Sequence, residues 1–254
     1  MKNTAIIIPT RLEAKRFPNK PLAEINNLPM IIHVLNRAKE SNVGQVYVAS
    51  PDMPIIEIVK KNGGQAILTK EDHSSGSDRV YEAYINNLKN EVDLIINLQG
   101  DMPNINPETI RMLEKLMKAG NWDIGTLASP IKNDHEINDK NVVKVSVNKS
   151  LEKDTFLNAI DFFRIKKNLT NEKIYHHIGI YAFTNDALTK YVKLSRSKLE
   201  MERNLEQMRA LENGIKIGVG LSNSSALSVD TEEDLEKVKR NMNILWAIKL
   251  KWLF

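Results

Sequence analysis

Short apolar strands alternate with amphipathic helices along the first half of the chain, and this alternation restricts the fold more than any other feature of the sequence. Residues 4–8 (Thr-Ala-Ile-Ile-Ile) are apolar almost throughout, which is typical of a strand buried on both faces. A helical apolar period follows at 29–40. The same order then recurs, with strands expected at 45–49, 66–68 and 94–98 and helices at 54–62, 78–88 and 107–119. This pattern predicts an α/β fold with a Rossmann-like, mostly parallel sheet flanked by helices.

The second half of the chain has a less regular pattern. Strands are expected at 142–147, 177–183 and 215–219, and helices at 199–211 and 231–245. No linker rich in Gly, Ser or Pro separates two regions of different composition. We therefore expect one domain over residues 1–245, with an insertion at roughly 125–185 that packs over the site or against a second subunit.

Composition excludes several classes of function. The 254 residues include no cysteine, so disulfides, thiolate metal sites and a cysteine nucleophile are ruled out. The net charge of +4 is small for this length, and its cations do not cluster along a helix, so we expect no nucleic-acid partner. No stretch approaches the ~18 apolar residues of a membrane span, and a cytoplasmic protein is expected.

The C-terminal residues 246–254 form an apolar and basic tail (Trp-Ala-Ile-Lys-Leu-Lys-Trp-Leu-Phe). The tail is too short to cross a bilayer. We expect it to pack on the domain or across a dimer, and the alternative is contact with a membrane interface.

The loop after the first strand carries the densest group of cations, Arg11, Lys15, Arg16 and Lys20. Ligands of a parallel sheet bind beyond the carboxyl ends of its strands, and cations in such a loop bind phosphate oxygens strongly. The loop lacks the glycines and the Gly-Lys-Ser/Thr ending of a P-loop. The alternative is a solvated basic turn.

Two aspartates follow predicted strands and are candidate Mg²⁺ ligands. Asp101 comes after the apolar strand 94–98, and Asp230 lies just ahead of the last helix. Carboxylates are the ligands that Mg²⁺ prefers, together with substrate phosphates. The alternative for each aspartate is that it caps the next helix. Asp101 is too far from the helix that starts at Pro107 to do so, whereas Asp230 or Thr231 is well placed to cap the last helix. The metal interpretation of Asp230 requires it to lie near Asp101.

A segment of small and polar residues, 72–79 (Asp-His-Ser-Ser-Gly-Ser-Asp-Arg), leads into a helix N-terminus. Backbone amides there can approach an anion or a base edge, and a plain Ser/Asp cap is the alternative. His176 and His177 lie in a predicted strand, where a histidine is more often a structural residue. The sequence shows no Ser/His/Asp arrangement and no histidine pair at i, i+4.

Six motifs in order resemble the 3-deoxy-manno-octulosonate cytidylyltransferases, which activate eight-carbon sugar acids. The resemblance covers nearly the whole chain. The motifs are Pro-Thr-Arg with Arg-Phe-Pro-Asn-Lys-Pro-Leu at 9–11 and 16–22, the 72–79 segment, Asn-Leu-Gln-Gly-Asp-Met-Pro at 97–103, His-His-Ile-Gly-Ile-Tyr at 176–181, Leu-Glu-Gln-Met-Arg at 205–209, and Ser-Val-Asp-Thr-Glu-Glu-Asp-Leu at 228–235.

The resemblance implies a fold like that of nucleotide-diphospho-sugar transferases and a reaction of CTP with a 2-keto-3-deoxy sugar acid, with Arg11, Lys20, Asp101 and Asp230 central to catalysis. It assigns CTP binding to Arg11, Arg16, Lys20, Ser75, Gly76, Ser77 and Arg79. It assigns Mg²⁺ to Asp101 and Asp230. It assigns the sugar acid to Gln99, His177, Tyr181, Glu206 and Gln207, with Arg164 as the nearest counterpart of an arginine expected at the substrate carboxylate. A homodimer and a role in lipopolysaccharide synthesis are also implied.

The sequence departs from the family pattern at four positions of these motifs. They are Ala14 in place of Ser, Asn19 in place of Gly, Met102 in place of Glu, and Ser228 in place of Gly. Two alternatives stay open. One is an enzyme for another acid, an 8-amino octulosonate or a nonulosonate, and the difference would lie in the poorly matched stretch at 149–167. The other is a non-catalytic nucleotide-binding relative, in which Ala14, Met102 and Ser228 mark the loss of activity.

Overall fold

The computed structural model describes the backbone of residues 3–13, 16–165, 172–224 and 227–251, and the side chains among them except those of 134 and 243–251. Ala14 and Lys15 therefore lie outside the described residues, as do the side chains of the tail.

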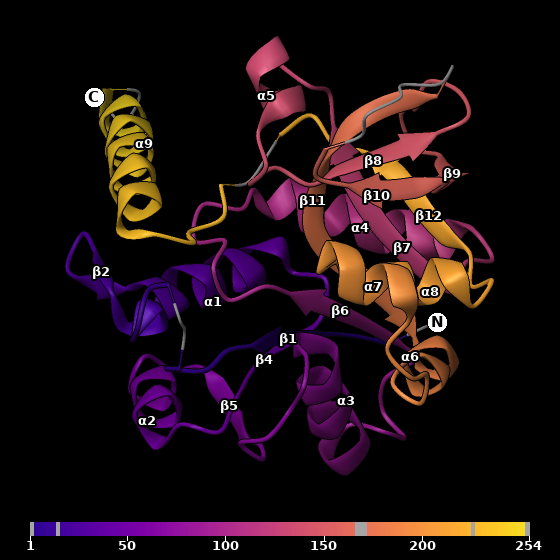
Figure 1. The fold of residues 1–254 in the computed structure, drawn as a ribbon. Helices are drawn as coiled ribbons and strands as arrows, with labels where there is room; N and C mark the ends of the chain where they lie inside the picture. The colour runs from indigo at the N-terminus through magenta and orange to yellow at the C-terminus, as the bar shows by residue number, and fades with distance from the viewer. Residues whose placement is uncertain (1–2, 14–15, 166–171, 225–226, 252–254) are drawn as a thin grey trace.

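A ten-stranded sheet runs through the molecule and confirms the α/β fold (Figure 1). Its strands follow the order β5-β4-β1-β6-β11-β7-β12-β9, with β8 and β10 attached beside β11. The N-terminal half is parallel: β5 (Gln65–Leu68), β4 (Gln45–Ser50), β1 (Thr4–Pro9) and β6 (Leu94–Leu98). The carboxyl ends of these strands consequently lie at one edge of the sheet.

The second half of the sheet is mixed. The long strand β11 (Lys173–Thr184) runs antiparallel to both β6 and β7 (Ile124–Ser129). Strand β12 (Ile217–Leu221) is parallel to β7, and β9 (Phe156–Asn158) closes that edge. The stretch 125–185 thus supplies central strands as well as the smaller pair β8 (Lys144–Val147) and β10 (Asp161–Phe163).

Two apolar cores cover the two faces of the sheet, because successive side chains of a strand point to opposite faces. Ile6 and Ile8 face the core that holds α1 (Met30–Ser41), α2 (Met53–Lys61) and α4 (Pro107–Ala119). Ala5 and Ile7 face the core that holds α3 (Gly76–Asn87), α6 (Asn185–Tyr191) and α8 (Met208–Glu212). The helices and strands predicted in the first half all form, with ends displaced by one or two residues.

The helix predicted at 199–211 is wrong as a continuous element. The structure divides it into α7 (Lys198–Arg203) and α8, with Asn204 between them in the left-handed region at φ 51°. Among the described residues beyond 120, five elements have no counterpart in the prediction: β7, β9, β10, α6 and the short α5 (Asp134–Asn138). Their sequences are short or lack a clear apolar period, so their formation depends on contacts with distant parts of the chain.

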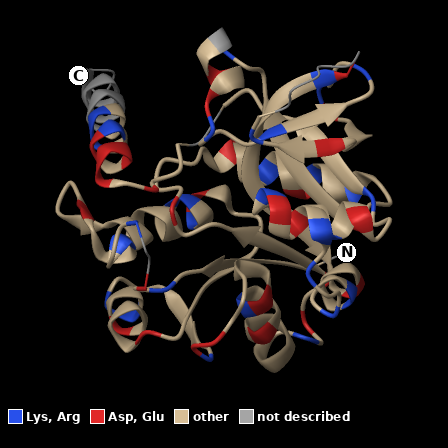
Figure 2. Cartoon of the chain, in the orientation of Figure 1, with Lys and Arg blue, Asp and Glu red and all other residues tan. Residues whose placement is uncertain are grey.

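The last helix, α9 (Glu232–Lys251), stands at one side of the molecule above β2 (Glu24–Ile25) and β3 (Leu28–Pro29) (Figure 1). Its first turns pack on a small third core that contains Leu235 and Val238. Acidic residues occupy its first turn and basic residues follow (Figure 2), an order that complements the helix dipole. None of the described helices is long and apolar enough to span a bilayer.

Candidate active site

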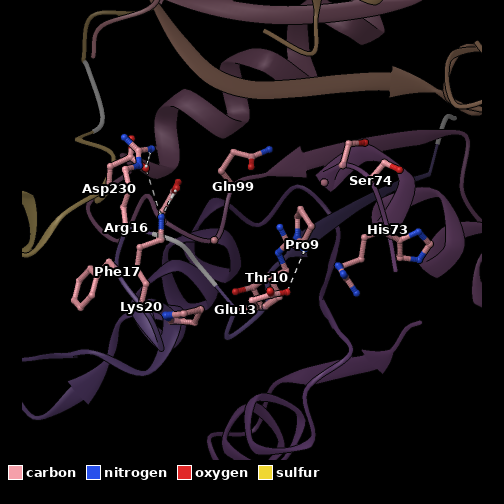
Figure 3. A pocket seen from close by; sticks show the side chains of 17 residues that line it. Pro9, Thr10, Glu13, Arg16, Phe17, Lys20, His73, Ser74, Gln99 and Asp230 are labelled. Carbon is pink, nitrogen blue, oxygen red and sulfur yellow. Dashed lines mark hydrogen bonds and ion pairs between the residues drawn. The ribbon is translucent and has the colours of Figure 1, made fainter. Parts of the chain in front are cut away.

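Four segments at the carboxyl edge of the parallel strands enclose a pocket of about 420 Å³ (Figure 3). They are the loop after β1, the segment between β5 and α3, the loop after β6 and the segment ahead of α9. More than 200 residues separate the first from the last. The sequence-predicted residues that line the pocket are Arg11, Arg16, Lys20, Ser75, Gly76, Arg79, Gln99, Asp101 and Asp230.

Lys20 lies between the two predicted metal ligands. Its Nζ is 2.9 Å from Asp101 Oδ2 and 3.8 Å from Asp230 Oδ1, and it also donates to the carbonyl of Val229 at 2.7 Å. Arg16 Nη2 reaches Asp230 Oδ1 at 3.0 Å. The two aspartates therefore share one cation, which is the proximity that the metal interpretation required.

The first loop reaches this geometry through Asn19. Asn19 has φ 55°, in the left-handed region that glycine favours and asparagine tolerates, so this departure from the family pattern preserves the turn. The turn leads into a short 3-10 helix at Lys20–Leu22, which carries Lys20 toward the carboxylates. Arg11 lies on the rim, half-exposed, with Nη1 4.0 Å from Glu13 Oε2.

Neither aspartate is used as a helix cap. Asn106 caps α4, since its side chain accepts from the Glu108 amide at 3.0 Å. At the start of α9, Thr231 Oγ1 accepts from the Asp234 amide at 3.2 Å, and so Thr231 takes the capping position. Both carboxylates are consequently free to face the pocket.

The two carboxylates are the groups that can hold Mg²⁺ here. Asp101 Oδ1 is buried and has no hydrogen-bond partner among the described residues, which suits a cation ligand. The described residues contain no group of three or more His, Cys, Asp or Glu side chains that could hold a metal ion. With two protein carboxylates, the remaining ligands of a six-coordinate Mg²⁺ would be phosphate oxygens and water.

The α3 end of the pocket combines helix capping with pocket lining. Ser75 Oγ accepts from the Asp78 amide at 3.2 Å, so the capping alternative holds for this residue, which also lines the pocket. Ser77 is buried and accepts from Asn97 Nδ2 at 3.4 Å. Arg79 is buried, and its guanidinium donates to Thr69 Oγ1 and to the Lys70 carbonyl at 2.8 Å. Arg79 therefore holds the 69–71 segment against α3 at the pocket wall.

The residues predicted to face the sugar acid divide between two hollows on either side of Gln99. Tyr181, Glu206 and Gln207 line a cavity of about 30 Å³. His177 and Arg164 line an open cleft of about 620 Å³ that also includes Asp101 and Asp230. Gln99 lines both hollows and the pocket described above, so it lies at their junction.

Burial disfavours the charged forms of two groups in the smaller hollow. Burial raises the pKa of the Tyr181 hydroxyl, which has no hydrogen-bond partner among the described residues. Burial also raises the pKa of Glu206, against the lowering effect of hydrogen bonds from Ser77 and Ser75. The protonated form of Glu206, which can donate a hydrogen bond, is therefore more favoured here than it would be for an exposed carboxyl.

His177 is buried in the interior of β11. Its Nε2 lies 3.0 Å from Thr126 Oγ1, and its ring packs edge-on against Phe162 with centroids 5.1 Å apart. Burial lowers the pKa of His177 to about 3, so the imidazole is neutral at physiological pH. These contacts are those of a structural residue, although His177 also lines the large cleft.

Acid should destabilise the protein through His177. An unfolded histidine titrates near 6.5 and the buried one near 3, so below pH 6.5 the unfolded state binds one proton more and the free energy of unfolding falls. Between pH 7 and pH 5 we expect this group to account for about 2 kcal/mol of lost stability. Urea unfolding should show that the free energy of unfolding of His177→Gln falls less between pH 7 and pH 5 than that of the unaltered protein. His135→Gln, at an exposed position, is the control and should lose as much stability as the unaltered protein. Equal losses in both variants would contradict the assignment.

Sequence reasoning did not single out two polar residues near the clefts, Thr126 and Lys144. Both are wholly buried within strands. A signal existed for Lys144, because a lone lysine interrupts the apolar run Val-Val-Lys-Val at 142–145. The departure Met102 is also buried, and a side chain at Gly179 would meet its Cε at 3.1 Å.

A cationic loop that faces two carboxylates at the carboxyl edge of this sheet is suited to bind phosphates, and the comparisons with known proteins place the chain among the α/β nucleotidyltransferases. The family model described as "Cytidylyltransferase" matches residues 5–217. The 3-deoxy-manno-octulosonate cytidylyltransferases of Brucella canis and Brucella anthropi are each 42% identical over 237 residues, which cover 93% of this chain and 94% and 95% of theirs. The chain therefore belongs to the 3-deoxy-manno-octulosonate cytidylyltransferase family.

A solved structure agrees with this assignment. The chain is similar to CMP:2-keto-3-deoxy-manno-octonic acid synthetase complexed with CTP, with a TM-score of 0.85 and 35% identity over 95% of this chain and 98% of the other. The family resemblance noted in the sequence is thus confirmed. The chain is an enzyme, a cytidylyltransferase, and the non-catalytic alternative is not supported.

Proposed function

We propose that this enzyme transfers CMP from CTP to 3-deoxy-manno-octulosonate and releases pyrophosphate. The observation that carries the proposal is the meeting of Lys20 with Asp101 and Asp230 in a pocket that opens, past Gln99, to the two hollows described above. Family membership supports both the nucleotide and the acid.

The reaction joins the anomeric oxygen of the acid to the α-phosphorus of CTP. The oxygen attacks in line, its proton is lost, and the bond from the α-phosphorus to pyrophosphate breaks. This chemistry asks the protein for positioning and neutralisation of charge. Arg11, Arg16 and Lys20 line the pocket and are suited to hold the phosphates and the leaving pyrophosphate.

Asp101 and Asp230 would hold Mg²⁺ in this site. The ion supplies polarisation of the phosphate oxygens and lowers the pKa of a bound hydroxyl. The free Oδ1 of Asp101 and the position of Asp230 beside the same cation support this role.

The acid would bind in the two hollows that Gln99 lines beside the pocket. Arg164 lines the large cleft with His177 and is suited to bind the substrate carboxylate, because guanidinium groups recognise carboxylates in bidentate fashion. Tyr181, Glu206 and Gln207 supply the polar groups of the smaller hollow and would meet the sugar hydroxyls.

Pyrophosphate release with CTP and Mg²⁺ tests the proposal. 3-Deoxy-manno-octulosonate, its 8-amino analogue and N-acetylneuraminate are supplied in separate reactions. We expect release with 3-deoxy-manno-octulosonate at a kcat/KM at least about tenfold above that for the other two acids. Preference for either of the others would assign the enzyme to that acid. If none of the three acids gives pyrophosphate release although CTP still binds, the proposed reaction is refuted.

We propose, from the same family membership, a homodimer in the cytoplasm whose product enters lipopolysaccharide synthesis.

A further inference from the structure

Lys144 is a lysine enclosed entirely by protein. Its side chain is 0% exposed, which is rare for a lysine, since the ammonium must be satisfied when it leaves water. Nζ donates to the carbonyls of Asp139 at 2.6 Å, Val142 at 3.0 Å and Arg164 at 2.6 Å. All three N–H bonds of the ammonium are therefore used on backbone oxygens.

Arg164 completes the same arrangement from the opposite direction. Its Nη1 donates to the carbonyls of Lys140 and Asn141, each at 3.1 Å. The four consecutive carbonyls of the loop 139–142 thus accept from two cations, Lys144 and Arg164. Lys144 also binds the backbone of Arg164, so it holds both the arginine and the loop that its guanidinium contacts.

This cluster forms a wall of the large cleft. Asp139, Asn141, Val142 and Arg164 line the cleft. The wall continues to β11, where the His177 amide donates to the Val143 carbonyl at 2.9 Å. In Figure 1, β8 lies beside β11, the strand that carries His177. A shift of the loop would therefore displace Arg164 and the histidine strand together.

Arg164 has one guanidinium edge that can bind an anion. The hydrogen-bond partners of Lys144 Nζ are neutral carbonyls. Burial lowers the pKa of Lys144, and the nearby Asp139 and Glu136 carboxylates oppose this lowering. Nε and Nη2 of Arg164 make no hydrogen bond with the described residues, which leaves one edge of the guanidinium for a ligand. This edge is the group of the wall that is suited to a carboxylate.

We propose that Lys144 is a positioning residue that holds Arg164 and the loop 139–142 in place for the carboxylate of the sugar acid. Lys144 does not touch the substrate and acts through Arg164. This inference rests on the proposed function, because it takes the acid to bind in the large cleft.

Lys144→Met tests the role by separating the Michaelis constants of the two substrates. The variant keeps the length of the side chain and removes the ammonium. We expect the KM for 3-deoxy-manno-octulosonate to rise at least about tenfold, since a displacement of about 1 Å is enough for such an effect, while kcat and the KM for CTP change less than about twofold. An unchanged KM for the acid in the folded variant would overturn the proposal.

Val145→Ala is the matched control. Val145 is the next residue of β8, is wholly buried in the apolar core, and contributes no bond to the loop. Its truncation weakens the fold through a cavity but should leave the KM for the acid unchanged. An equal rise in both variants would show general weakening of β8 and would overturn the role of Lys144.

A double-mutant cycle tests whether Lys144 acts through Arg164. Arg164→Ala should raise the KM for the acid by itself, and adding Lys144→Met should raise it no further. Independent, multiplying effects would overturn the coupling.

Hydrogen exchange of the unaltered enzyme gives a readout that does not depend on a variant that folds. Amides of residues 139–144 should exchange at least about threefold more slowly with 3-deoxy-manno-octulosonate and an α,β-methylene analogue of CTP than with the analogue alone. Equal exchange would refute the role of this wall. The two proposals can be refuted separately. If the unaltered enzyme releases no pyrophosphate, the proposed function is refuted. If it releases pyrophosphate normally and Lys144→Met leaves the KM for the acid unchanged, only the positioning role is refuted.

Discussion

Replacement of Asp101 by asparagine should lower the rate of pyrophosphate release by about 10²–10³-fold or more. The amide keeps the shape of the side chain but removes the negative charge that faces Lys20 at 2.9 Å. It also replaces one of the two carboxylate oxygens by an NH2 group, which cannot bind a cation. An uncharged ligand holds Mg²⁺ poorly, and the charge that develops on the transferred phosphate is then less well stabilised.

The measurement is kcat with saturating CTP and acid over a range of Mg²⁺ concentrations. Circular dichroism and thermal unfolding should show a folded variant, since Asp101 contributes to no core. Asp186→Asn, at an exposed position of α6, should retain full activity as the matched control. Near-normal turnover of Asp101→Asn with Mg²⁺ would contradict the metal assignment.

Glu200→Gln should be the most destabilising single change near the acceptor hollows, at a cost of about 3–5 kcal/mol. Glu200 forms a bidentate pair with Arg209, with Nε to Oε2 at 2.8 Å and Nη2 to Oε1 at 2.7 Å, and both side chains are at most 4% exposed. Burial opposes the charge of Glu200, but the hydrogen bonds from Arg209 and Arg196 outweigh it and lower the pKa of the carboxyl. Removing that charge leaves the Arg209 guanidinium buried without a counter-ion.

Thermal and urea unfolding give the size of this effect, and a Tm lower by roughly 10 °C is expected for a chain of this length. Glu202→Gln is the matched control on α7, because its exposed pair with Lys198 at 3.8 Å should contribute less than about 1 kcal/mol. The double variant Glu200→Leu with Arg209→Met should be more stable than Glu200→Gln, because it leaves no unpaired charge. A loss below about 1 kcal/mol in Glu200→Gln would contradict the account.

The same pair explains an error of the sequence interpretation. Residues 199–211 have a helical pattern of apolar and charged side chains, and local pattern alone favours one helix. In the structure the chain turns at Asn204, so that Arg209 on α8 reaches back to Glu200 on α7. The turn places Glu206 and Gln207 on the small hollow. Helix propensity cannot predict the pairing of Glu200 with Arg209, because this pairing depends on where the two short helices pack on the sheet.

The candidate site divides in the same way. The position of Asp101 after a buried strand was sufficient to predict its place at the carboxyl edge, because parallel strands share that edge. Asp230 was ambiguous between a cap and a ligand, and the structure gives the cap to Thr231, so the metal role of Asp230 stays a prediction. Lys144 was overlooked, since the meaning of a lysine within an apolar run depends on the carbonyls that surround it in the folded chain.

Local periodicity and motifs of adjacent residues were enough to predict the alternation of buried strands and amphipathic helices, the cationic loop, the two aspartates and the family. Which side chains meet depended on the folding of the whole chain. It brought Asp230 to Lys20 across 210 positions, divided the acceptor residues between two hollows at Gln99, and enclosed Lys144 beneath Arg164. The physical reason is that a charge or a hydroxyl acquires its role from partners distant in sequence, and burial sets the energy of each such contact.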